Sequence, residues 1–203
     1  MKKYAVLHEP GDIVTLAGTR FVVLDVERRG SLPDSLFLLA LESVGASEFG
    51  SSNNYAESDL KKAVDKWLED MGKRGLDNAK LIPREIDLTT LDGSGCYGKL
   101  SVKAAPLTLD EAREYADIIP NAERWCWLAT GWSGPSKSDG DLALCVGSNG
   151  GWGGGNCSYS FGIRPALKAP SILFEDSEAG LDLSKIPTDD LLQEIHRRLA
   201  EKA

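Results

Sequence analysis

The chain contains 203 residues, 42% of them hydrophobic and 27% charged, a balance typical of a globular protein with its own core. Its formal net charge of −8 disfavours nucleic acid and anionic membranes as partners, because both attract basic surfaces. No stretch approaches the ~18 apolar residues of a membrane-spanning helix. The residues after Met1 lack the apolar segment of a secretory signal. Composition therefore predicts a protein with no membrane span and no classical signal peptide.

The first forty residues predict a hairpin that is followed by a buried strand. Runs of β-branched and aromatic residues at 13–16 and 21–26 are joined by a short connection that contains Gly18. Residues 36–41 form a short, continuously apolar run, which is typical of a buried strand beside that hairpin. Between them, residues 28–34 predict an exposed turn.

Two helices are predicted from capping residues and from apolar spacing. Ser58 is placed to cap the first, and Gly72 or Gly75 to end it. Thr108 and Glu111 form the pattern of a capping box for the second, which runs to about residue 116. The first helix carries an apolar face that we expect to pack into the core, formed by Leu60, Val64, Trp67, Leu68 and Met71.

The second half of the chain alternates apolar segments with polar loops. Short apolar pieces occupy residues 81–83 and 86–91, and segments typical of strands occupy residues 125–130, 142–146, 161–167 and 171–174. Glycine-containing loops lie between some of them, at 92–98 and 131–140. After an acidic stretch, residues 187–203 predict a terminal helix with a narrow apolar stripe. One helix cannot bury such a stripe alone, so it would dock on its own domain or on a second copy of the chain, and we favour the second copy.

Residues 148–160, with the sequence Ser-Asn-Gly-Gly-Trp-Gly-Gly-Gly-Asn-Cys-Ser-Tyr-Ser, have an unusual composition. Gly, Ser and Asn dominate the run, so it has little side chain with which to build a core. Trp152 and Tyr159 nevertheless interrupt it, and apolar segments flank it on both sides. Aromatic rings give a large contact area at small entropic cost, while Ser, Gly and Asn adapt their hydrogen bonds. The composition therefore favours a displayed, loop-like binding surface over a flexible linker.

The four cysteines lack the two-residue spacing of a zinc site or a redox pair. Cys145 and Cys157 flank the glycine-rich run, where a disulfide would join its two ends. Four reduced thiols are the alternative, and the lack of a signal peptide favours it.

Several stretches of the chain resemble a known family. They are Trp-Cys-Trp-Leu-Ala-Thr at 125–130, Leu-Ala-Leu-Cys-Val at 142–146 and Phe-Gly-Ile-Arg-Pro-Ala-Leu at 161–167, with a weaker likeness in Leu-Thr-Leu-Asp-Glu-Ala at 107–112. With these segments the chain resembles the variable proteins of bacterial and phage diversity-generating retroelements, which have the C-type-lectin fold. The likeness covers roughly residues 11–174, and its most specific piece is the Gly-Ile-Arg-Pro-Ala-Leu string at 162–167.

The resemblance implies an α+β protein with a C-type-lectin-like fold, in which two helices pack on antiparallel sheets and long loops are displayed. This ligand-binding domain would span residues 1–174, followed by an acidic linker at 175–186 and an amphipathic C-terminal helix at 187–203. Arg164 is expected to belong to the framework, where its guanidinium pairs with a buried carboxylate or with carbonyl groups.

The resemblance also implies a set of variable positions. In that family, mutagenic reverse transcription replaces template adenines, so that an Asn codon comes to encode Asn, Ser, Gly, Tyr or Asp among others, but never Trp or Lys. Trp152 would then be framework or derive from another codon, and Ser136, Ser138 and Asp139 share the permitted composition. With Trp152, Tyr159 and Trp132 as aromatic anchors, the predicted ligand-contacting positions are Trp132, Ser133, Ser148, Asn149, Gly150, Gly151, Trp152, Gly153, Gly154, Gly155, Asn156, Ser158, Tyr159 and Ser160.

An enzyme needs convergent titratable groups, and the sequence offers few. The only histidines, His8 and His196, are remote from any Ser- or Cys-rich motif. Formylglycine-generating oxidases have a related fold and use a cysteine pair, which leaves Cys145 and Cys157 as the enzymatic alternative. A calcium-dependent lectin would need clustered oxygen ligands, of which residues 138–141 supply two carboxylates. We therefore expect no catalytic residue, no metal and no cofactor.

The sequence as a whole predicts a non-catalytic ligand- or receptor-binding protein with a diversified, adhesin-like surface. The expected partner is a protein or glycan on a cell surface, and the C-terminal helix is expected to form a homo-oligomer. A structural or assembly subunit of a phage particle is the alternative. We expect the chain on a virion or in the cytoplasm.

Overall fold

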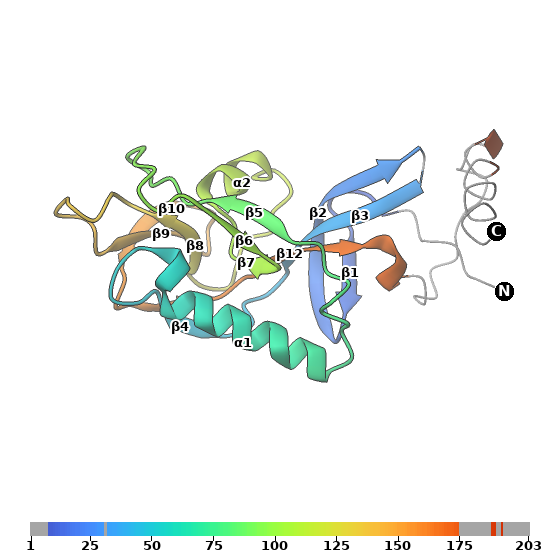
Figure 1. Cartoon of the computed structure of the whole chain (residues 1–203), viewed down its shortest axis with the longest axis horizontal. Coiled ribbons are helices and arrows are strands. Elements are labelled where there is room, and N and C mark those ends of the chain that lie inside the picture. Colours follow the sequence, from blue (N-terminus) through green and yellow to red (C-terminus); the bar gives the residue numbers. More distant parts are fainter. Residues whose placement is uncertain (1–7, 31, 175–187, 190–191, 193–203) are drawn as a thin grey trace.

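The structure, a computed structural model, describes residues 8–30, 32–174, 188–189 and 192. Within them the chain is an α+β protein in which two α-helices and two short 3₁₀-helices accompany three sheets, as predicted (Figure 1). The predicted linker at 175–186 and nearly all of the predicted helix at 187–203 lie outside the described residues. Among the helices that the structure describes, none is long and apolar enough to cross a membrane.

The first sheet has the strand order β1-β2-β3-β12-β7. Its strands are β1 (Ile13–Leu16), β2 (Thr19–Arg29), β3 (Leu32–Ala40), β12 (Ala166–Pro170) and β7 (Ala104–Ala105). The predicted hairpin is confirmed, and Ala17 and Gly18 connect β1 and β2 with positive φ angles of 47° and 75°. The exposed turn predicted at 28–34 is shorter than predicted, because β2 and β3 continue their antiparallel pairing out to Arg29 and Leu32. Exposed Gly30, at φ 63°, follows the end of β2. Main-chain hydrogen bonds extend this hairpin beyond its apolar residues.

The second sheet has the order β10-β9-β8-β11-β4 and carries the glycine-rich run. Its strands are β10 (Trp152–Asn156), β9 (Leu142–Val146), β8 (Cys126–Gly131), β11 (Ser160–Gly162) and β4 (Ala46–Glu48). Its pairs are antiparallel except for β11 with β8, which is parallel, so the expectation of purely antiparallel sheets is wrong at this point. A third, two-stranded sheet pairs β5 (Arg84–Asp87) with β6 (Lys99–Val102), so only the first two residues of the apolar piece at 86–91 lie in a strand.

Both predicted helices form with the predicted caps. α1 (Asp59–Lys73) begins after Ser58, whose hydroxyl accepts from the backbone N–H of Lys61, and ends before Gly75 at φ 103°. α2 (Leu109–Glu114) begins with the capping box of Thr108 and Glu111 and is shorter than predicted. The apolar face of α1 packs into the core, and half-buried Trp67 lies 6.3 Å from Phe21 between ring centroids.

The strand predicted at 161–167 is wrong, because β11 and β12 belong to different sheets and residues 163–165 connect them. Pro165 has no N–H with which to continue a ladder. Its carbonyl accepts from Ala40, at the end of β3, while Ile163 exchanges bonds with Val44 and Gly45. The strand predicted at 171–174 is instead the 3₁₀-helix η2 (Ser171–Phe174).

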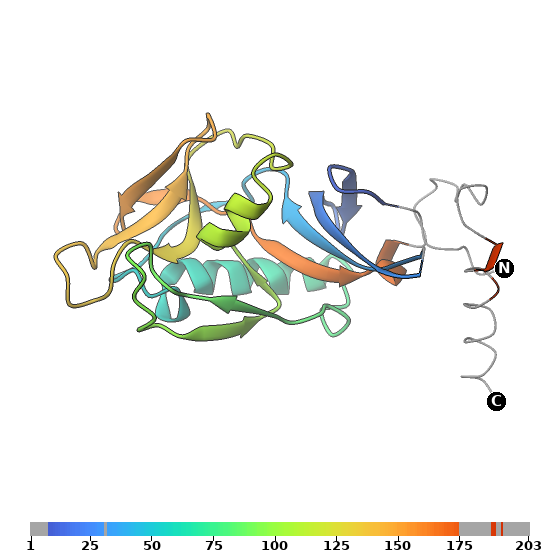
Figure 2. The same ribbon diagram turned by 90° about the horizontal axis from the view of Figure 1, so that it is seen from above.

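The second sheet lies between two apolar clusters. Successive side chains of a strand point to opposite faces, so Trp127 of β8 packs in the cluster that contains α1, whereas Leu128 packs in the cluster that contains α2. α1 and α2 accordingly lie on opposite sides of this part of the molecule (Figures 1 and 2). We call these two sides of the second sheet the α1 face and the α2 face.

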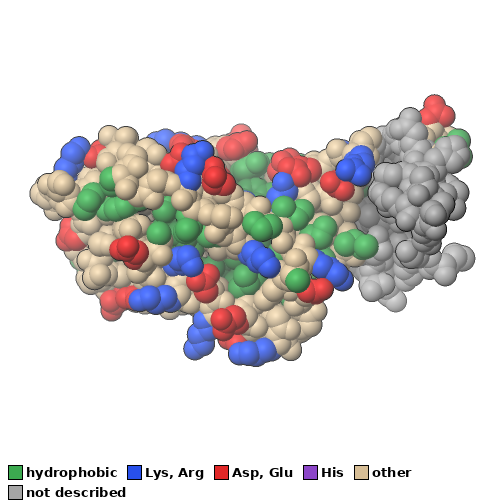
Figure 3. Space-filling model, viewed as in Figure 1, with side chains coloured by type: hydrophobic (Ala, Val, Ile, Leu, Met, Phe, Trp, Pro, Cys, Tyr) green, Lys and Arg blue, Asp and Glu red, His purple; other side chains and the backbone are tan. Residues whose placement is uncertain are grey.

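Acidic and basic side chains are interspersed over the molecular face shown in Figure 3. Lys and Arg form no continuous patch among the described residues of that face.

Candidate ligand-binding surface

The glycine-rich run is a paired strand and not one continuous loop. β10 pairs with β9 along its whole length, from Trp152 opposite Val146 to Asn156 opposite Leu142. A tight turn precedes it, in which Gly147 donates to the carbonyl of Gly151 at 2.7 Å. The expectation of a loop is therefore wrong at 152–156. Backbone hydrogen bonds, which need no side chains, hold this edge strand on the sheet.

The glycines of β10 lie against aromatic rings. A Cβ atom on Gly154 would lie 2.7 Å from the ring of Trp132, and one on Gly155 would lie 2.6 Å from the ring of Phe161. On Gly153 it would lie 3.2 Å from the ring of Trp125. These distances are shorter than ordinary van der Waals contact. Gly153, Gly154 and Gly155 are therefore packing positions, which argues against the expectation that their side chains vary.

Among the polar side chains of the run, Asn149 and Asn156 form hydrogen bonds in the turns beside β10, whereas the serines are exposed. Asn156 donates to Asp141 at 2.7 Å and accepts from the backbone of Ser158 at 3.1 Å, so it closes the turn after β10. Asn149 accepts from the backbone N–H of Gly151 at 3.0 Å. Ser148 and Ser160 are exposed, as Ser158 and Asn149 are. The exposed polar positions therefore lie at the two ends of β10 and not along it.

Three of the predicted positions are restricted by their surroundings. Ser133 is only 3% exposed, since its loop turns inward and its carbonyl accepts from the side chain of Asn53 at 2.9 Å. Gly150 has a φ of 77°, and a Cβ there would lie 2.9 Å from Oδ1 of Asn121. On half-buried Gly151 it would lie 3.0 Å from Oδ1 of Asn149. Ser133 does not belong to the exposed surface, in contrast to Ser136, Ser138 and Asp139.

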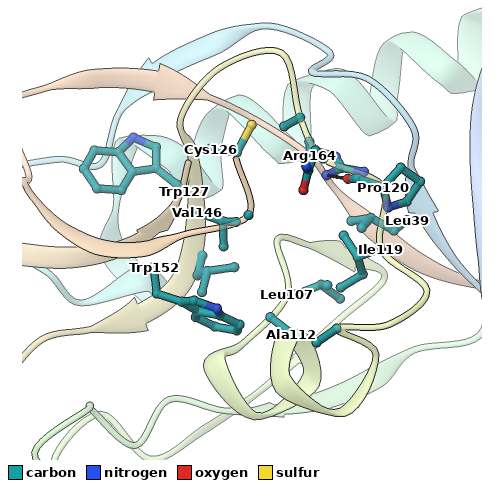
Figure 4. A pocket seen from close by; sticks show the side chains of 15 residues that line it. Leu39, Leu107, Ala112, Ile119, Pro120, Cys126, Trp127, Val146, Trp152 and Arg164 are labelled. Atoms are coloured by element: carbon teal, nitrogen blue, oxygen red, sulfur yellow. Dashed lines mark hydrogen bonds between the residues drawn. The ribbon is translucent and has the colours of Figure 1, made fainter. Parts of the chain in front are cut away.

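The aromatic residues of the site lie on both faces of the second sheet. Trp152 is 43% exposed and pairs with Val146, whose side chain packs on the α2 face, where half-buried Trp132 also packs. Tyr159 is 56% exposed and lies 6.0 Å from Phe161, which packs against Trp127 on the α1 face. Figure 4 shows the ring of Trp152 directed toward α2 and that of Trp127 directed away from it. The predicted anchors therefore do not form one continuous patch.

Trp125 is a site residue that the sequence analysis missed. It is 43% exposed and stacks on Phe161 at 6.2 Å between centroids, with an interplanar angle of 29°. Its ring also lies over Gly147 and Gly153. The sequence analysis placed Trp125 in the apolar strand predicted at 125–130. Its position just before the strand β8, beside charged Arg124, could have indicated that its side chain is exposed. Trp125, Phe161 and Tyr159 form what we call the aromatic platform.

A pocket opens under Trp152 on the α2 face (Figure 4). It has a volume of about 100 Å³, and its walls are mainly aliphatic, with Leu107 and Ala112 from the α2 side, Leu128 and Val146 from the sheet, and Ile119 from the loop after α2. Asn121, Gly150 and Trp152 line its outer part, and Arg164 and Cys126 line its inner part. Trp152 also lines a second hollow of about 480 Å³, together with Trp132 and Arg113.

Arg164 is 6% exposed and connects three segments of the chain. Its Nε donates to the carbonyl of Ala40 at 2.9 Å, and its Nη1 donates to the carbonyl of Pro120 at 3.0 Å. These bonds confirm the expectation that Arg164 pairs with carbonyl groups of the framework. Its Nη2 is buried without a hydrogen-bond partner.

The four cysteines are free thiols, and Cys126, Cys145 and Cys157 are buried. The disulfide considered between Cys145 and Cys157 is thus absent. Burial raises the pKa of Cys145 to about 11 and that of Cys157 to about 12, so both thiols are protonated at neutral pH and are weak nucleophiles. Among the described residues, no group of three or more His, Cys, Asp and Glu side chains is arranged to hold a metal ion.

Comparisons of the chain with family models, with curated proteins and with solved structures found no match. The α+β class and the geometry above are therefore the basis for any assignment of function.

Proposed function

We propose that this chain is a non-catalytic binding protein that recognises a protein or glycan on a cell surface. The observation that carries the proposal is the exposure of three large aromatic side chains around one glycine-rich edge strand: Trp125, Trp152 and Tyr159 are 43%, 43% and 56% exposed. Exposed rings held on rigid elements are the anchors of many binding surfaces. Trp125 directly precedes the buried strand β8, Trp152 begins the paired strand β10, and Tyr159 directly precedes β11, so the rings are in place before a ligand arrives.

The proposal includes a C-type-lectin-like fold and a diversified surface. Its support is the Gly-Ile-Arg-Pro-Ala-Leu string at 162–167 together with the exposed Ser, Asn and Tyr residues that surround β10. The packing against aromatic rings narrows the positions that can vary without changing the framework. These are Ser148, Asn149, Ser158, Tyr159 and Ser160.

Binding is tested with the purified chain, which carries a fluorescent tag and is applied to a printed glycan array and to an array of bacterial surface proteins. The variants are Trp152→Ala and the double replacement Trp125→Ala/Tyr159→Ala. A matched control is Ile172→Ala, because Ile172 is 58% exposed and lies in η2. In Figure 1, η2 is at the opposite end of the molecule from β10.

We expect the wild type and the control to bind the same array spots equally. At least one aromatic variant should lose this binding although its melting temperature equals that of the wild type. Binding that all variants retain would contradict the proposal, and so would a chain that binds nothing on either array. A chain that binds nothing would favour the alternative, a structural subunit of a particle.

Diversification is tested at the level of the gene. We expect a near-repeat of the coding sequence for residues 125–160 beside a reverse-transcriptase gene, with differences at template adenines concentrated in the codons for the five positions above. The codons for Gly153–Gly155 should match between the two copies. A genome without such a repeat would contradict the proposed diversification. The proposed binding function would still stand or fall by the array experiment.

A further inference from the structure

The strand β10 forms an edge of the second sheet, and its main-chain groups point alternately toward β9 and away from it. Gly151 continues the register of β10, and its carbonyl accepts from Gly147 at 2.7 Å. Because residues that bond across an antiparallel pair alternate with residues that do not, every second residue from Gly151 onward faces β9. The N–H and C=O groups of Trp152 and Gly154 therefore point away from β9.

These outward groups are accessible to a partner. Gly154 is exposed, and because glycine has no side chain, its exposed atoms belong to the main chain. In the described part of the chain β10 pairs with β9 alone, and no other main-chain hydrogen bond involves Trp152 or Gly154. Proteins commonly protect a sheet edge by keeping it short or by placing Pro or charged residues on it. β10 contains neither Pro nor a charge, and with five residues it is the longest of the four edge strands of the two larger sheets.

The hollow of about 480 Å³ lies beside this edge on the α2 face. Trp152 and Gly153 of β10 line it together with Trp132, and Figure 4 shows the ring of Trp152 directed toward α2. Its other lining residues, which are mainly apolar, are Leu91, Leu109, Arg113, Ala116 and Leu144. A Cβ atom on Gly154 would point at the ring of Trp132, so Gly154 faces the same side.

The position of the hollow decides where the side chains of an added strand would lie. Residues directly opposite each other in two antiparallel strands place their side chains on the same face of the sheet. A strand that paired with β10 would therefore direct the side chains opposite Trp152 and Gly154 toward the hollow. Gly154 has no side chain of its own to fill this space, so a large side chain on the added strand would fit beside it.

We propose that β10 binds an extended segment of a partner protein as an additional antiparallel strand, with an aromatic side chain of that segment opposite Gly154 in the hollow. In such complexes the main-chain hydrogen bonds supply affinity and the pockets for alternate side chains supply specificity. An aromatic residue on a neighbouring strand also covers the gap that an edge glycine leaves. This inference rests on the proposed binding function, and it names a polypeptide as the partner.

A second copy of the chain fits this edge less well than a foreign segment. The free edge of five residues is a strip roughly 17 Å long and 5 Å wide, whereas a stable protein interface buries about 1,200–2,000 Å². The one large side chain of β10, Trp152, already lies along the hollow of its own chain. The partner must therefore supply the side chains that β10 lacks, and a short extended segment is sufficient to do so.

The probe is the peptide acetyl-Thr-Phe-Thr-Leu-Thr-amide, whose Phe and Leu share one face of an extended strand and would lie opposite Gly154 and Trp152. Two N-methylated forms are its matched controls. Methylation of the Phe nitrogen removes an N–H that would bond to β10, whereas methylation of the central Thr nitrogen removes one that points away. In titrations followed by ¹H–¹⁵N spectra we expect the first form to bind about tenfold more weakly than the second. Equal affinities of the two forms, or no binding of the parent peptide, would overturn the proposal.

Hydrogen exchange of the main-chain amides identifies the edge that the peptide occupies. In the free protein the amides of Trp152 and Gly154 should exchange faster than those of Gly153 and Gly155, which face β9. Saturation with the peptide should slow exchange at Trp152 and Gly154 by about tenfold or more. Unchanged rates at these two amides with peptide bound would overturn the proposal. Protection of the same amides at high protein concentration without peptide would show that a second copy occupies the edge, and would also overturn it.

Variants of the protein test the role of the hollow. Ala116 is exposed and lines it, so Ala116→Phe should occupy the space and weaken peptide binding by about tenfold or more. Ala79→Phe adds the same side chain at an exposed position outside the hollow and should leave the affinity unchanged. If Ala116→Phe lowers the melting temperature, the smaller replacement Ala116→Leu takes its place. Peptide affinity that survives in the folded variant would overturn the proposal. Array spots that persist while the peptide fails to bind would reject the added strand alone and retain the proposed binding function.

Discussion

A Cβ atom on Gly155 would lie 2.6 Å from Cε2 of Phe161, so the aromatic ring occupies the space that any other residue at this position would need. The same atom would lie 2.9 Å from Cη2 of Trp127, which is only 1% exposed. Close-packed interiors leave such rings little room to withdraw. Gly155 is thus required by the packing of β10 on the aromatic cluster, whatever role its neighbours have in binding.

Replacement of Gly155 by Ala should destabilise the protein. Overpacking of a well-packed site costs about 1–3 kcal/mol, and we expect a loss of this size in the free energy of unfolding measured by urea denaturation. Ser148→Ala is the control, because Ser148 is exposed at the other end of β10 and its loss should change stability by about 0.5 kcal/mol or less. Equal denaturation midpoints for the two variants would show that the rings of Phe161 and Trp127 move aside at little cost, and would contradict this prediction.

Trp152 and Tyr159 should behave as independent residues, because they lie on opposite faces of the second sheet. A double-mutant cycle on Trp152→Ala and Tyr159→Ala should give a coupling of about 0.5 kcal/mol or less in the free energy of unfolding. The pair Tyr159→Ala and Phe161→Leu should couple by about 0.5–1.5 kcal/mol, as expected for rings in edge contact. A larger coupling for the first pair than for the second would contradict the assignment of faces.

Asn53 should be important for the stability of the loop at 131–140, although it lies far away in sequence. Its amide donates to the carbonyls of Ser133 at 2.9 Å and Leu142 at 3.0 Å, and it accepts from the hydroxyl of Tyr97 at 2.6 Å. Asn53→Ala removes the side-chain donor to the Ser133 carbonyl and the acceptor of the Tyr97 hydroxyl, while the Leu142 carbonyl keeps the backbone N–H of Trp132. We expect a loss of about 1–3 kcal/mol in the free energy of unfolding. Ser51→Ala, at an exposed neighbouring position, should be close to neutral. Equal midpoints in urea for the two variants would exclude this role.

The thiols should differ sharply in reactivity. Cys96 is exposed, whereas burial raises the pKa of Cys126, Cys145 and Cys157 and also shields them from reagents. Titration of the folded protein with Ellman's reagent at pH 8 should therefore release one equivalent quickly, and unfolding in guanidinium should release four. Cys96→Ser should abolish the fast phase. A fast phase of two or more equivalents would show that the second sheet opens readily.

Features set by local interactions could be predicted from the sequence. The caps at Ser58 and Thr108 were confirmed because a helix N-terminus is satisfied by a side chain only a few residues away. The strand at 142–146 and the hairpin around Gly18 were confirmed for the same reason, since apolar runs and turn residues are local signals. Even the carbonyl partners of Arg164 followed from the chemistry of a buried guanidinium, although their identities, Ala40 and Pro120, did not.

The binding site was harder to predict, because it depends on contacts between residues that are distant in the chain. The run at 148–160 looks like a loop by composition, and it contains a strand because β9 supplies hydrogen-bond partners that no local pattern reveals. Its glycines look like variable positions until Phe161, Trp125 and Trp132 are seen to occupy the space beside them.

The sequence by itself determined the α+β class, the two capped helices and the presence of a glycine-rich segment that carries Trp and Tyr. Only the tertiary structure decided that Trp152 and Tyr159 lie on opposite faces, that Trp125 is exposed, and that Arg164 reaches into an apolar pocket. The physical reason is that capping and helical periodicity act within a few residues. The direction in which a side chain points, and the neighbours that cover it, depend on the pairing of strands across the whole chain.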